Sequence, residues 1–441
     1  MIKRIIAAKI LELKQKYPVI SITGPRQSGK TSLVRELFAD YDYCNLENLD
    51  SLALARSDPK SFLKVGTGER LVIDEIQKFP ELLSYIQVEV DAQKKDGQFI
   101  ITGSQNFSIG EGISQSLAGR VANFTLLPLA FAEVQASAYK KLFTDSKESI
   151  LRGFYPRSLV KNIQPEDFYR DYLSTYVERD VRQIKNIGNL SVFQKFLQLI
   201  SGRVGQLVNF SSLANDVGVN YKTIESWLSI LEASYIVYSL PPYYENYGKR
   251  VIKSPKVYFY DVGLLCHLLK INSVYELEAH FAYGQIFENF VINEIQKNNF
   301  NLRKNEQVYF WRDSGGSEID MVIDSGKNKR GVEIKAGQTF DSDMLKGLSQ
   351  WQSLDPQKNM STSLVYNGTA EQKVREHEVV NWKTFLGRAS LPQYQKAPDR
   401  SQEMNGVFSE SRFRYGVSTP PLGSSGKKPP TAVGGVSLNH N

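Results

Sequence analysis

Eight residues near the amino terminus have the types and the spacing of a phosphate-binding loop. Gly24 to Thr31 read Gly-Pro-Arg-Gln-Ser-Gly-Lys-Thr, which fits the pattern G-x-x-x-x-G-K-[ST]. Glycines let backbone N–H groups curl around phosphate oxygens, Lys30 would reach the β- and γ-phosphates, and the Thr31 hydroxyl would hold Mg²⁺. The alternative is a glycine turn ahead of a surface helix. The apolar run at 17–23 favours a bound nucleoside triphosphate, because it supplies the strand that such a loop follows.

Two acids follow a second apolar strand, at residues 70–73. At the carboxyl end of a strand beside the phosphate loop, Asp74 would hold Mg²⁺ through water, and Glu75 would orient or polarise the attacking water. The alternative for this pair is a helix cap, because carboxylates favour helix amino termini. Together with the loop, the pair predicts nucleotide hydrolysis.

Further polar residues follow the next expected strand, at 98–103. Ser104 or Asn106 could reach the γ-phosphate or the lytic water, although ordinary turn chemistry would also place polar side chains there. Arg120 could act on transition-state charge in its own chain or across a subunit interface. The predicted nucleotide-binding residues are Gly24, Pro25, Arg26, Gln27, Ser28, Gly29, Lys30, Thr31, Ser32, Asp74 and Ser104, with Lys30, Glu75 and Arg120 as catalytic candidates.

A third candidate group lies far along the chain. Glu288 falls on an expected helix, Asp320 on an expected strand, and Glu333 and Lys335 on the next strand in a Glu-x-Lys pattern. Carboxylate oxygens of this kind hold Mg²⁺, here through Asp320 and Glu333, and a lysine beside the metal can position or deprotonate water for phosphodiester cleavage. Glu318 is expected to be a solvated strand-end acid. Such short acidic patterns also occur by chance on strands.

The elements between these groups predict a helical lid and a winged helix. An amphipathic helix at 168–184 is expected to cover the nucleotide. Residues 210–232, between Asn209 and Leu240, fit a helix, a turn at Gly218 and a second helix opened by Asn220, and a basic segment at 247–256 would form the wing. On DNA, the groove-facing residues would be Asn220, Tyr221, Lys222, Thr223 and Ser226. A winged helix can equally serve as a protein-contact module.

Composition sets the outer limits. The 441 residues are too many for one ordinary core, so two or three domains are expected. A net charge of +7 favours an anionic partner such as DNA, although excess charge also accompanies a merely solvated surface. Cys44 and Cys266 lie far apart without metal-ligand spacing, which predicts a reducing, cytoplasmic environment. No signal peptide or membrane span is expected, and the 4 scattered histidines argue against a zinc site.

These motifs, in this order, resemble the AAA-type P-loop ATPases of bacteria and archaea that carry a fixed carboxyl-terminal region. The carboxylate group likewise resembles the PD-(D/E)xK restriction-endonuclease-like family. The resemblance implies an α/β fold: an AAA-type parallel sheet, a helical lid, a winged helix and a nuclease-like α/β domain. It also implies ATP and Mg²⁺ as cofactors, an interface role for Arg120 and homo-oligomers built through the AAA-type core. The Gly-Phe-Tyr-Pro turn at 153–156 is followed by Arg157, where an acid is more usual in the family.

The predicted domains are the ATPase core at 1–150, the lid at 151–190, the winged helix at 191–262, the nuclease-like domain at 263–390 and a disordered tail at 391–441. The tail is rich in proline, serine and glycine and has too little apolar surface to offset the entropy of ordering. Two functions fit this arrangement: an ATP-driven machine that acts on DNA, or a nucleotide-switched regulatory or scaffold protein whose nuclease-like fold is inactive. A third is ATP binding without turnover.

Overall fold

In the computed structural model, the described residues are 2–66, 70–104, 116–177, 190–243, 254–313, 315–326, 328–354 and 360–390. All of them fall within one unit of the chain. The predicted disordered tail at 391–441 lies outside these ranges. Among the described helices, none is long and apolar enough to cross a membrane.

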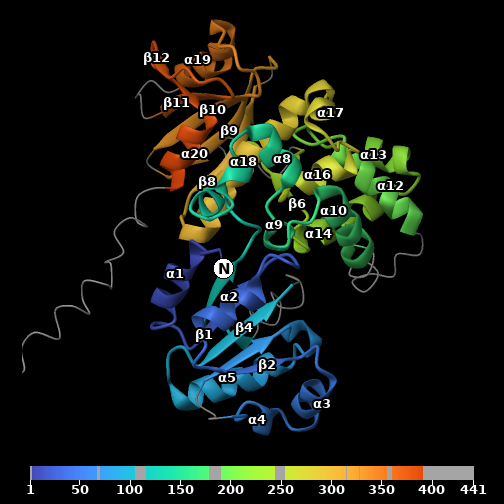
Figure 1. Ribbon diagram of the computed structural model, residues 1–441, viewed down its shortest axis with the longest axis vertical. Helices are drawn as coiled ribbons and strands as arrows, with labels where there is room; N and C mark the ends of the chain where they lie inside the picture. Colours follow the sequence, from blue (N-terminus) through green and yellow to red (C-terminus); the bar gives the residue numbers. More distant parts are fainter. Residues whose placement is uncertain are drawn as a thin grey trace, which may run out of the picture. The chain divides into compact units, whose positions relative to one another are not determined.

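A five-stranded parallel sheet forms the amino-terminal part of the molecule (Figure 1). Its order is β2-β3-β4-β1-β5, and every neighbouring pair runs parallel. The strands are β1 (Val19–Thr23), β2 (Asp42–Asn45), β3 (Leu71–Asp74), β4 (Phe99–Gly103) and β5 (Val121–Thr125). Because the carboxyl ends of parallel strands meet at one edge, the phosphate loop, Asp74 and Ser104 are brought to the same edge.

Helices cover both faces of this sheet, because successive side chains of a strand point to opposite faces. Ile20 and Ile22 of β1 pack in a cluster with residues of α1 and α2, whereas Val19 packs with residues of α3, α4 and α5. The helices are α1 (Ile6–Leu13), α2 (Lys30–Leu37), α3 (Leu49–Ser57), α4 (Pro59–Phe62) and α5 (Leu82–Gln93). The central strands β1, β3 and β4 are therefore buried along their whole length.

Short helices follow the sheet: α7 (Phe131–Gln135), α8 (Ser146–Arg152), α9 (Pro156–Val160) and α10 (Pro165–Tyr172). The helix expected at 168–184 begins earlier, at Pro165, whose fixed φ suits a first helical turn. A π-helix, Leu173–Val177, continues it, and residues 178–189 lie outside the described ranges. Tyr169 of α10 donates a hydrogen bond of 2.6 Å to Asp261, which caps α16 (Val262–Leu268). A lid over the nucleotide stays a prediction.

The middle of the chain forms the expected helix, turn and helix. The elements are α12 (Leu190–Ser201), α13 (Phe210–Val217), α14 (Tyr221–Ala233) and the antiparallel strands β6 (Val237–Leu240) and β7 (Lys256–Phe259). Gly218 ends α13 with a φ of 88°, which favours glycine. The Asn220 side chain accepts a hydrogen bond from the Thr223 backbone N–H and so caps α14. Most of the expected wing, residues 247–253, lies outside the described residues.

A mixed six-stranded sheet follows, in the order β12-β13-β11-β10-β9-β8. Its strands are β8 (Gln307–Arg312), β9 (Glu318–Asp324), β10 (Lys329–Lys335), β11 (Met360–Tyr366), β12 (Gln372–Val374) and β13 (His377–Asn381). The helices of this part are α17 (Val274–Ala279), α18 (Tyr283–Leu302), α19 (Lys346–Ser353) and α20 (Trp382–Ser390). The three strands and the helix predicted around the carboxylates are confirmed.

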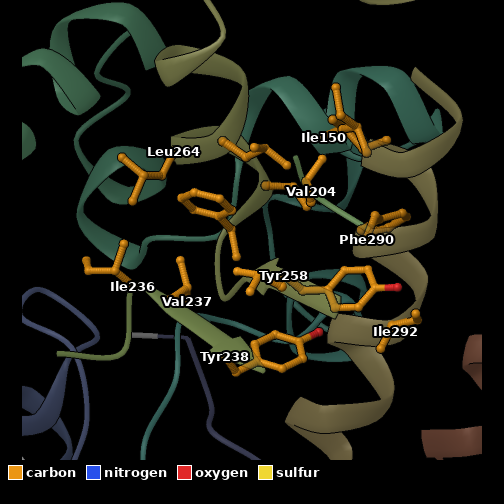
Figure 2. Packing of buried hydrophobic residues seen from close by; sticks show 14 of the residues in the cluster. Ile150, Val204, Ile236, Val237, Tyr238, Tyr258, Leu264, Phe290 and Ile292 are labelled. Carbon is orange, nitrogen blue, oxygen red and sulfur yellow. The ribbon is translucent and has the colours of Figure 1, made fainter. Parts of the chain in front are cut away.

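One hydrophobic core joins the helix-turn-helix part to α18. Tyr238 of β6 and Tyr258 of β7 belong to the same buried cluster as Phe290 and Ile292 of α18. Figure 2 shows these side chains between the two-stranded sheet and the helix. The predicted boundary between residues 262 and 263 therefore falls within a shared core and does not separate two cores.

Candidate nucleotide-binding site

The phosphate loop joins β1 to α2, and two glycines determine its path. Gly24 has a φ of 147° and Gly29 a φ of 96°, which other residue types rarely adopt. A Cβ atom on Gly24 would lie 2.2 Å from the carbonyl oxygen of Leu126, the residue that follows β5. The loop therefore packs directly on the neighbouring backbone. It leads into the amino terminus of α2, where the helix dipole favours anions.

Buried polar groups of the loop suit a phosphate ligand. The Lys30 ammonium is buried and donates to the carbonyl oxygens of Gly24 and Pro25, each at 2.9 Å. The Ser28 hydroxyl is fully buried and has no hydrogen-bond partner within the described part of the chain. Because buried polar groups are normally paired, the Ser28 hydroxyl fits an anionic ligand that completes its hydrogen bonding.

The other predicted loop residues lie around this cradle. Arg26 Nη1 lies 3.9 Å from Glu47 Oε1, and Gln27 adopts a φ of 59°. Ser32 is exposed on the first turn of α2. Pro25 is buried. The structure thus keeps all the predicted loop residues together, although only some of them face away from solvent.

The two predicted Mg²⁺ ligands of this site are in contact. The Thr31 hydroxyl donates to Asp74 Oδ2 at 2.8 Å, across from α2 to the end of β3. Hydroxyl and carboxylate oxygens are ligands that Mg²⁺ accepts, usually beside phosphate oxygens and water and with few protein carboxylates. The residues present therefore fit a magnesium ion that is held jointly with a nucleotide.

Three hydroxyl groups hold Asp74, which is almost completely buried. Besides Thr31, Tyr43 of β2 donates to its Oδ2 at 2.6 Å, and Thr102 of β4 donates to its Oδ1. Burial and the hydrogen bond to Asp74 raise the pKa of Tyr43 to about 12, so this phenol keeps its proton and acts as a donor. Tyr43 and Thr102 were not predicted from the sequence. They converge because β2, β3 and β4 are adjacent strands.

Glu75 is held by two polar neighbours. Its Oε2 accepts hydrogen bonds from the amide of Gln77 and, at 3.3 Å, from the hydroxyl of Ser104. Gln77 Nε2 also lies 3.1 Å from Ser104 Oγ, which closes a triangle. Glu75 adopts a φ of 59° and its side chain does not cap the short helix that follows, contrary to the helix-cap alternative. Ser104 lies beside Glu75, and its role at the nucleotide stays a prediction, whereas Asn106 lies outside the described residues.

Arg120 lies at the other end of the sheet. It precedes β5, whose first residue Val121 pairs with Val19 at the start of β1. The phosphate loop follows Thr23 at the end of β1, about 13 Å away at ~3.3 Å per residue. The guanidinium instead makes hydrogen bonds of 2.6 and 2.8 Å with Asp91 of α5. The prediction that Arg120 acts on the nucleotide of its own chain is therefore wrong, and only a role across an interface stays open.

The second predicted group also comes together, at the start of β9 and the end of β10. Lys335 pairs with Glu333 and lies 3.9 Å from Asp320, and the Ile334 backbone N–H donates to Asp320 at 2.8 Å. Burial and the nearby Asp320 charge raise the pKa of Glu333, and burial raises that of Glu288 despite its lysine partner. The structure thus confirms that these four residues share one neighbourhood.

A lysine from β7 occupies the same cluster and was missed by the sequence. Lys256 is almost fully buried, and its ammonium lies 3.3 Å from Glu288 Oε1 and pairs with Glu318. Burial alone would lower the pKa of Lys256, but the charges of Glu288, Asp320 and Glu318 outweigh burial and raise it. Glu318 is therefore a partner of a buried cation, and its prediction as a solvated strand-end acid is wrong.

The carboxylate cluster does not fit a metal site as it stands. Each of its carboxylates faces a lysine, and among the described residues no group of 3 or more acidic, histidine or cysteine side chains is placed to hold a metal ion. Two ammonium groups already supply the positive charge that a divalent ion would bring. No catalytic step through a metal follows from this geometry.

Comparison with known proteins identifies the amino-terminal part. Residues 16–135 match the family model described as "AAA domain". "Uncharacterized protein Rv2008c" of Mycobacterium tuberculosis is 31% identical over 340 residues, which cover 76% of this chain and 74% of that protein. The chain belongs to the family of this mycobacterial protein. "Uncharacterized protein Mb2031c" of Mycobacterium bovis is also 31% identical to this chain over 340 residues, with the same coverage of both chains.

Family models also match two later stretches of the chain. Residues 143–275 match a domain of unknown function (DUF8612), and residues 283–385 match another (DUF4143). "Uncharacterized protein MJ1637" of Methanocaldococcus jannaschii is 24% identical over 226 residues, half of this chain and 46% of that protein. The second domain contains Glu288, Asp320, Glu333 and Lys335, whereas their partner Lys256 lies within the first.

Solved structures give weaker likenesses. The Walker-type ATPase PABY2304 of Pyrococcus abyssi has a TM-score of 0.41 at 14% identity, over 60% of this chain and 94% of that chain. The Thermotoga maritima RuvB Holliday junction branch migration motor has a TM-score of 0.27 at 19% identity, over 53% of this chain and 86% of that chain. Scores this low carry no argument, so the ATPase assignment rests on the AAA domain match and the site.

Proposed function

We propose that this protein binds ATP with Mg²⁺ and hydrolyses it. The AAA domain match supports an ATPase in general, and one observation carries the specific mechanism. The Thr31–Asp74 contact of 2.8 Å places the two predicted magnesium ligands together, next along the chain to a Glu75 carboxylate that Gln77 and Ser104 hold. A nucleotide site with a water-activating acid needs these parts.

The residues would share the work as follows. Backbone N–H groups of the loop and the amino terminus of α2 bind the phosphates, and Lys30 exchanges the carbonyls of Gly24 and Pro25 for phosphate oxygens. Thr31 and Asp74 hold Mg²⁺, which when bound neutralises charge that develops on the phosphates. Glu75 accepts a hydrogen bond from the attacking water and orients it.

The rate of ATP hydrolysis and the ATP affinity of full-chain variants test this mechanism. Glu75→Gln should slow turnover by about 10²- to 10⁴-fold, the usual size of a lost general base, and leave ATP affinity intact. Lys30→Ala should lose binding. Glu81→Gln, which changes an exposed acid ahead of α5, is the matched control and should behave like the wild type. An unchanged rate in Glu75→Gln would instead support ATP binding without turnover.

We infer further that hydrolysis is coupled to an activity on DNA. Support comes from the helix-turn-helix with its two-stranded sheet, which would form a winged helix, and from the net charge of +7. Lys222 is exposed on the first turn of α14, where a recognition helix meets DNA. The test is DNA affinity at two salt concentrations, with and without ATP. Lys222→Glu should weaken binding more than Lys346→Glu, which alters an exposed lysine of α19.

The second candidate is a nucleotide-switched regulatory or scaffold protein whose nuclease-like fold is catalytically inactive. The buried Lys256 favours it, because its ammonium pairs with two of the clustered acids. Cleavage of DNA with Mg²⁺ or Mn²⁺ that is lost in Asp320→Ala and Glu333→Ala would support an active nuclease. A protein that hydrolyses ATP yet neither binds nor cuts DNA would support the scaffold.

Assembly and location complete the proposal. A homo-oligomer built through the AAA-type core would let Arg120 meet the nucleotide of another copy. Measuring the molecular mass of wild type and Arg120→Ala in solution, with and without ATP, tests this assembly. A cytoplasmic location agrees with two free cysteines, Cys44 and Cys266. Fractionation of the native host cell would decide it.

A further inference from the structure

A buried arginine that precedes residue 16, where the AAA domain match begins, contacts a backbone carbonyl of the phosphate loop. Arg4 precedes α1, and only 7% of its surface is exposed. Its Nη1 donates to the carbonyl oxygen of Ser28 at 2.8 Å, and its Nη2 donates to that of Leu127 at 2.7 Å. Its Nε donates to Glu133 Oε2 at 3.1 Å. One guanidinium thus joins the loop to the segment after β5.

Glu133 fixes the position of that guanidinium. Its side chain is fully buried, and it accepts hydrogen bonds from the backbone N–H groups of Ile5 at 2.7 Å and Ala130 at 2.9 Å. Glu133 ends the run Leu-Pro-Leu-Ala-Phe-Ala-Glu at 127–133, to which the proposed function gives no role. Both oxygens of this carboxylate therefore accept hydrogen bonds. Arg4 is held between the phosphate loop and the segment 127–133.

The contact with Ser28 sets the direction of a peptide group in the loop. A trans peptide is planar, with its C=O and the following N–H pointing to opposite sides. Because the Ser28 C=O points to Arg4, the Gly29 N–H points to the other side of the loop. A Cβ on Gly29 would have Arg4 Nη1 and Pro156 Cγ as neighbours, both at 3.8 Å, which confirms that these groups lie close behind this peptide.

We propose that Arg4 is a positioning residue of the nucleotide site, which anchors the Ser28–Gly29 peptide so that its N–H faces the phosphates. The proposal rests on ATP binding by the loop. It extends the functional site to the segment before residue 16, where the AAA domain match begins. A planar guanidinium suits the task because its donors lie on three separate nitrogens at fixed positions, whereas the three donors of an ammonium radiate from a single atom.

A second buried ion pair provides a matched control. Glu294 and Lys297 of α18 pair at 2.7 Å and anchor the same segment, through the Phe131 N–H at 2.6 Å and the Leu129 carbonyl at 2.9 Å. Within the described part of the chain, the hydrogen bonds of these two side chains go to Phe131, to Leu129 and to each other, and none goes to the phosphate loop. The double variants Arg4→Met/Glu133→Gln and Glu294→Gln/Lys297→Met thus each remove one buried pair on this segment, but only the first removes a loop contact.

The experiment measures MgATP affinity by calorimetry and the melting temperature of the full chain. Arg4→Met/Glu133→Gln should bind MgATP about tenfold more weakly, the factor for about 1.4 kcal/mol, which is the size of one lost hydrogen bond to a charged group. The α18 double variant should lose stability but keep its affinity. Arg4→Lys should keep most of the stability and show an intermediate affinity.

The outcomes separate this inference from the proposed function. A wild type that does not bind MgATP removes the proposed function itself. If the wild type binds MgATP and both double variants lose affinity equally, the role of Arg4 is overturned. The integrity of the segment 127–133, and not the contact between Arg4 and the loop, would then determine the affinity. Wild-type affinity in folded Arg4→Lys and in Arg4→Met/Glu133→Gln overturns it as well.

Discussion

The carboxylate cluster makes the stability of this protein depend on pH, and one substitution should remove the part that Glu333 contributes. Burial, and then the charge of Asp320, raise the pKa of Glu333 from 4.5 to about 8. The folded protein therefore holds this proton more tightly than the unfolded chain does. The resulting stability is fully present below pH 4.5 and is lost as the pH rises through about 8.

Glu333→Gln tests this directly, because glutamine has the shape of a protonated glutamate and cannot ionise. One pKa unit corresponds to about 1.4 kcal/mol, so between pH 5 and pH 8 the wild type should lose on the order of 4 kcal/mol relative to the variant. The variant should match the wild type near pH 4.5, gain an increasing advantage up to about pH 8, and gain no more above it.

The assay is denaturant unfolding at half-unit steps from pH 5 to pH 9, with EDTA present so that no metal ion holds the carboxylates. Glu371→Gln changes an exposed acid of the same sheet region and is the control, which should show no pH-dependent advantage. Stability curves of wild type and Glu333→Gln that stay parallel across this range would refute the reasoning.

Four further substitutions, one of them a control, have defined outcomes. Gly24→Ala places a Cβ 2.2 Å from a backbone oxygen, and should cost about 3 kcal/mol of stability and abolish ATP binding in calorimetry. Gly218→Ala also has a positive φ but meets open space, so it should keep ATP binding. Tyr43→Phe removes one donor to the Asp74 carboxylate, worth about 1 kcal/mol, and should raise the Mg²⁺ concentration for half-maximal hydrolysis about fivefold. Lys256→Met leaves Glu288 buried without its cation and should lower stability by about 3–5 kcal/mol at pH 8 in denaturant unfolding.

Each of these expectations can fail. ATP binding by Gly24→Ala equal to that of Gly218→Ala would show that the loop moves freely away from β5. An unchanged magnesium dependence in Tyr43→Phe would mean that the other hydroxyls suffice to hold Asp74. Wild-type stability of Lys256→Met would show that its ammonium is dispensable to the cluster.

Local sequence patterns determined much of what the structure contains. The apolar run forms a buried strand, and the glycines, lysine and threonine at fixed positions after it form the phosphate loop. Gly218 and Asn220 delimit the turn between α13 and α14, because a positive φ and a helix cap each require particular side chains. Such features depend on a few neighbouring residues, so the chain itself encodes them.

Tertiary structure decided which charged side chains meet. Arg4 reaches Glu133 across 129 positions, and Lys256 reaches Glu288 from a strand of another part of the molecule. Arg120, by contrast, is kept away from the loop because it lies at the opposite end of a parallel sheet. No spacing rule links these residues, because their contacts arise only when separate elements pack. The sequence by itself determined the residues of the phosphate loop and the acids that follow the next strand. The packing of distant segments decided which side chains hold those residues, and it placed Arg120 away from the loop.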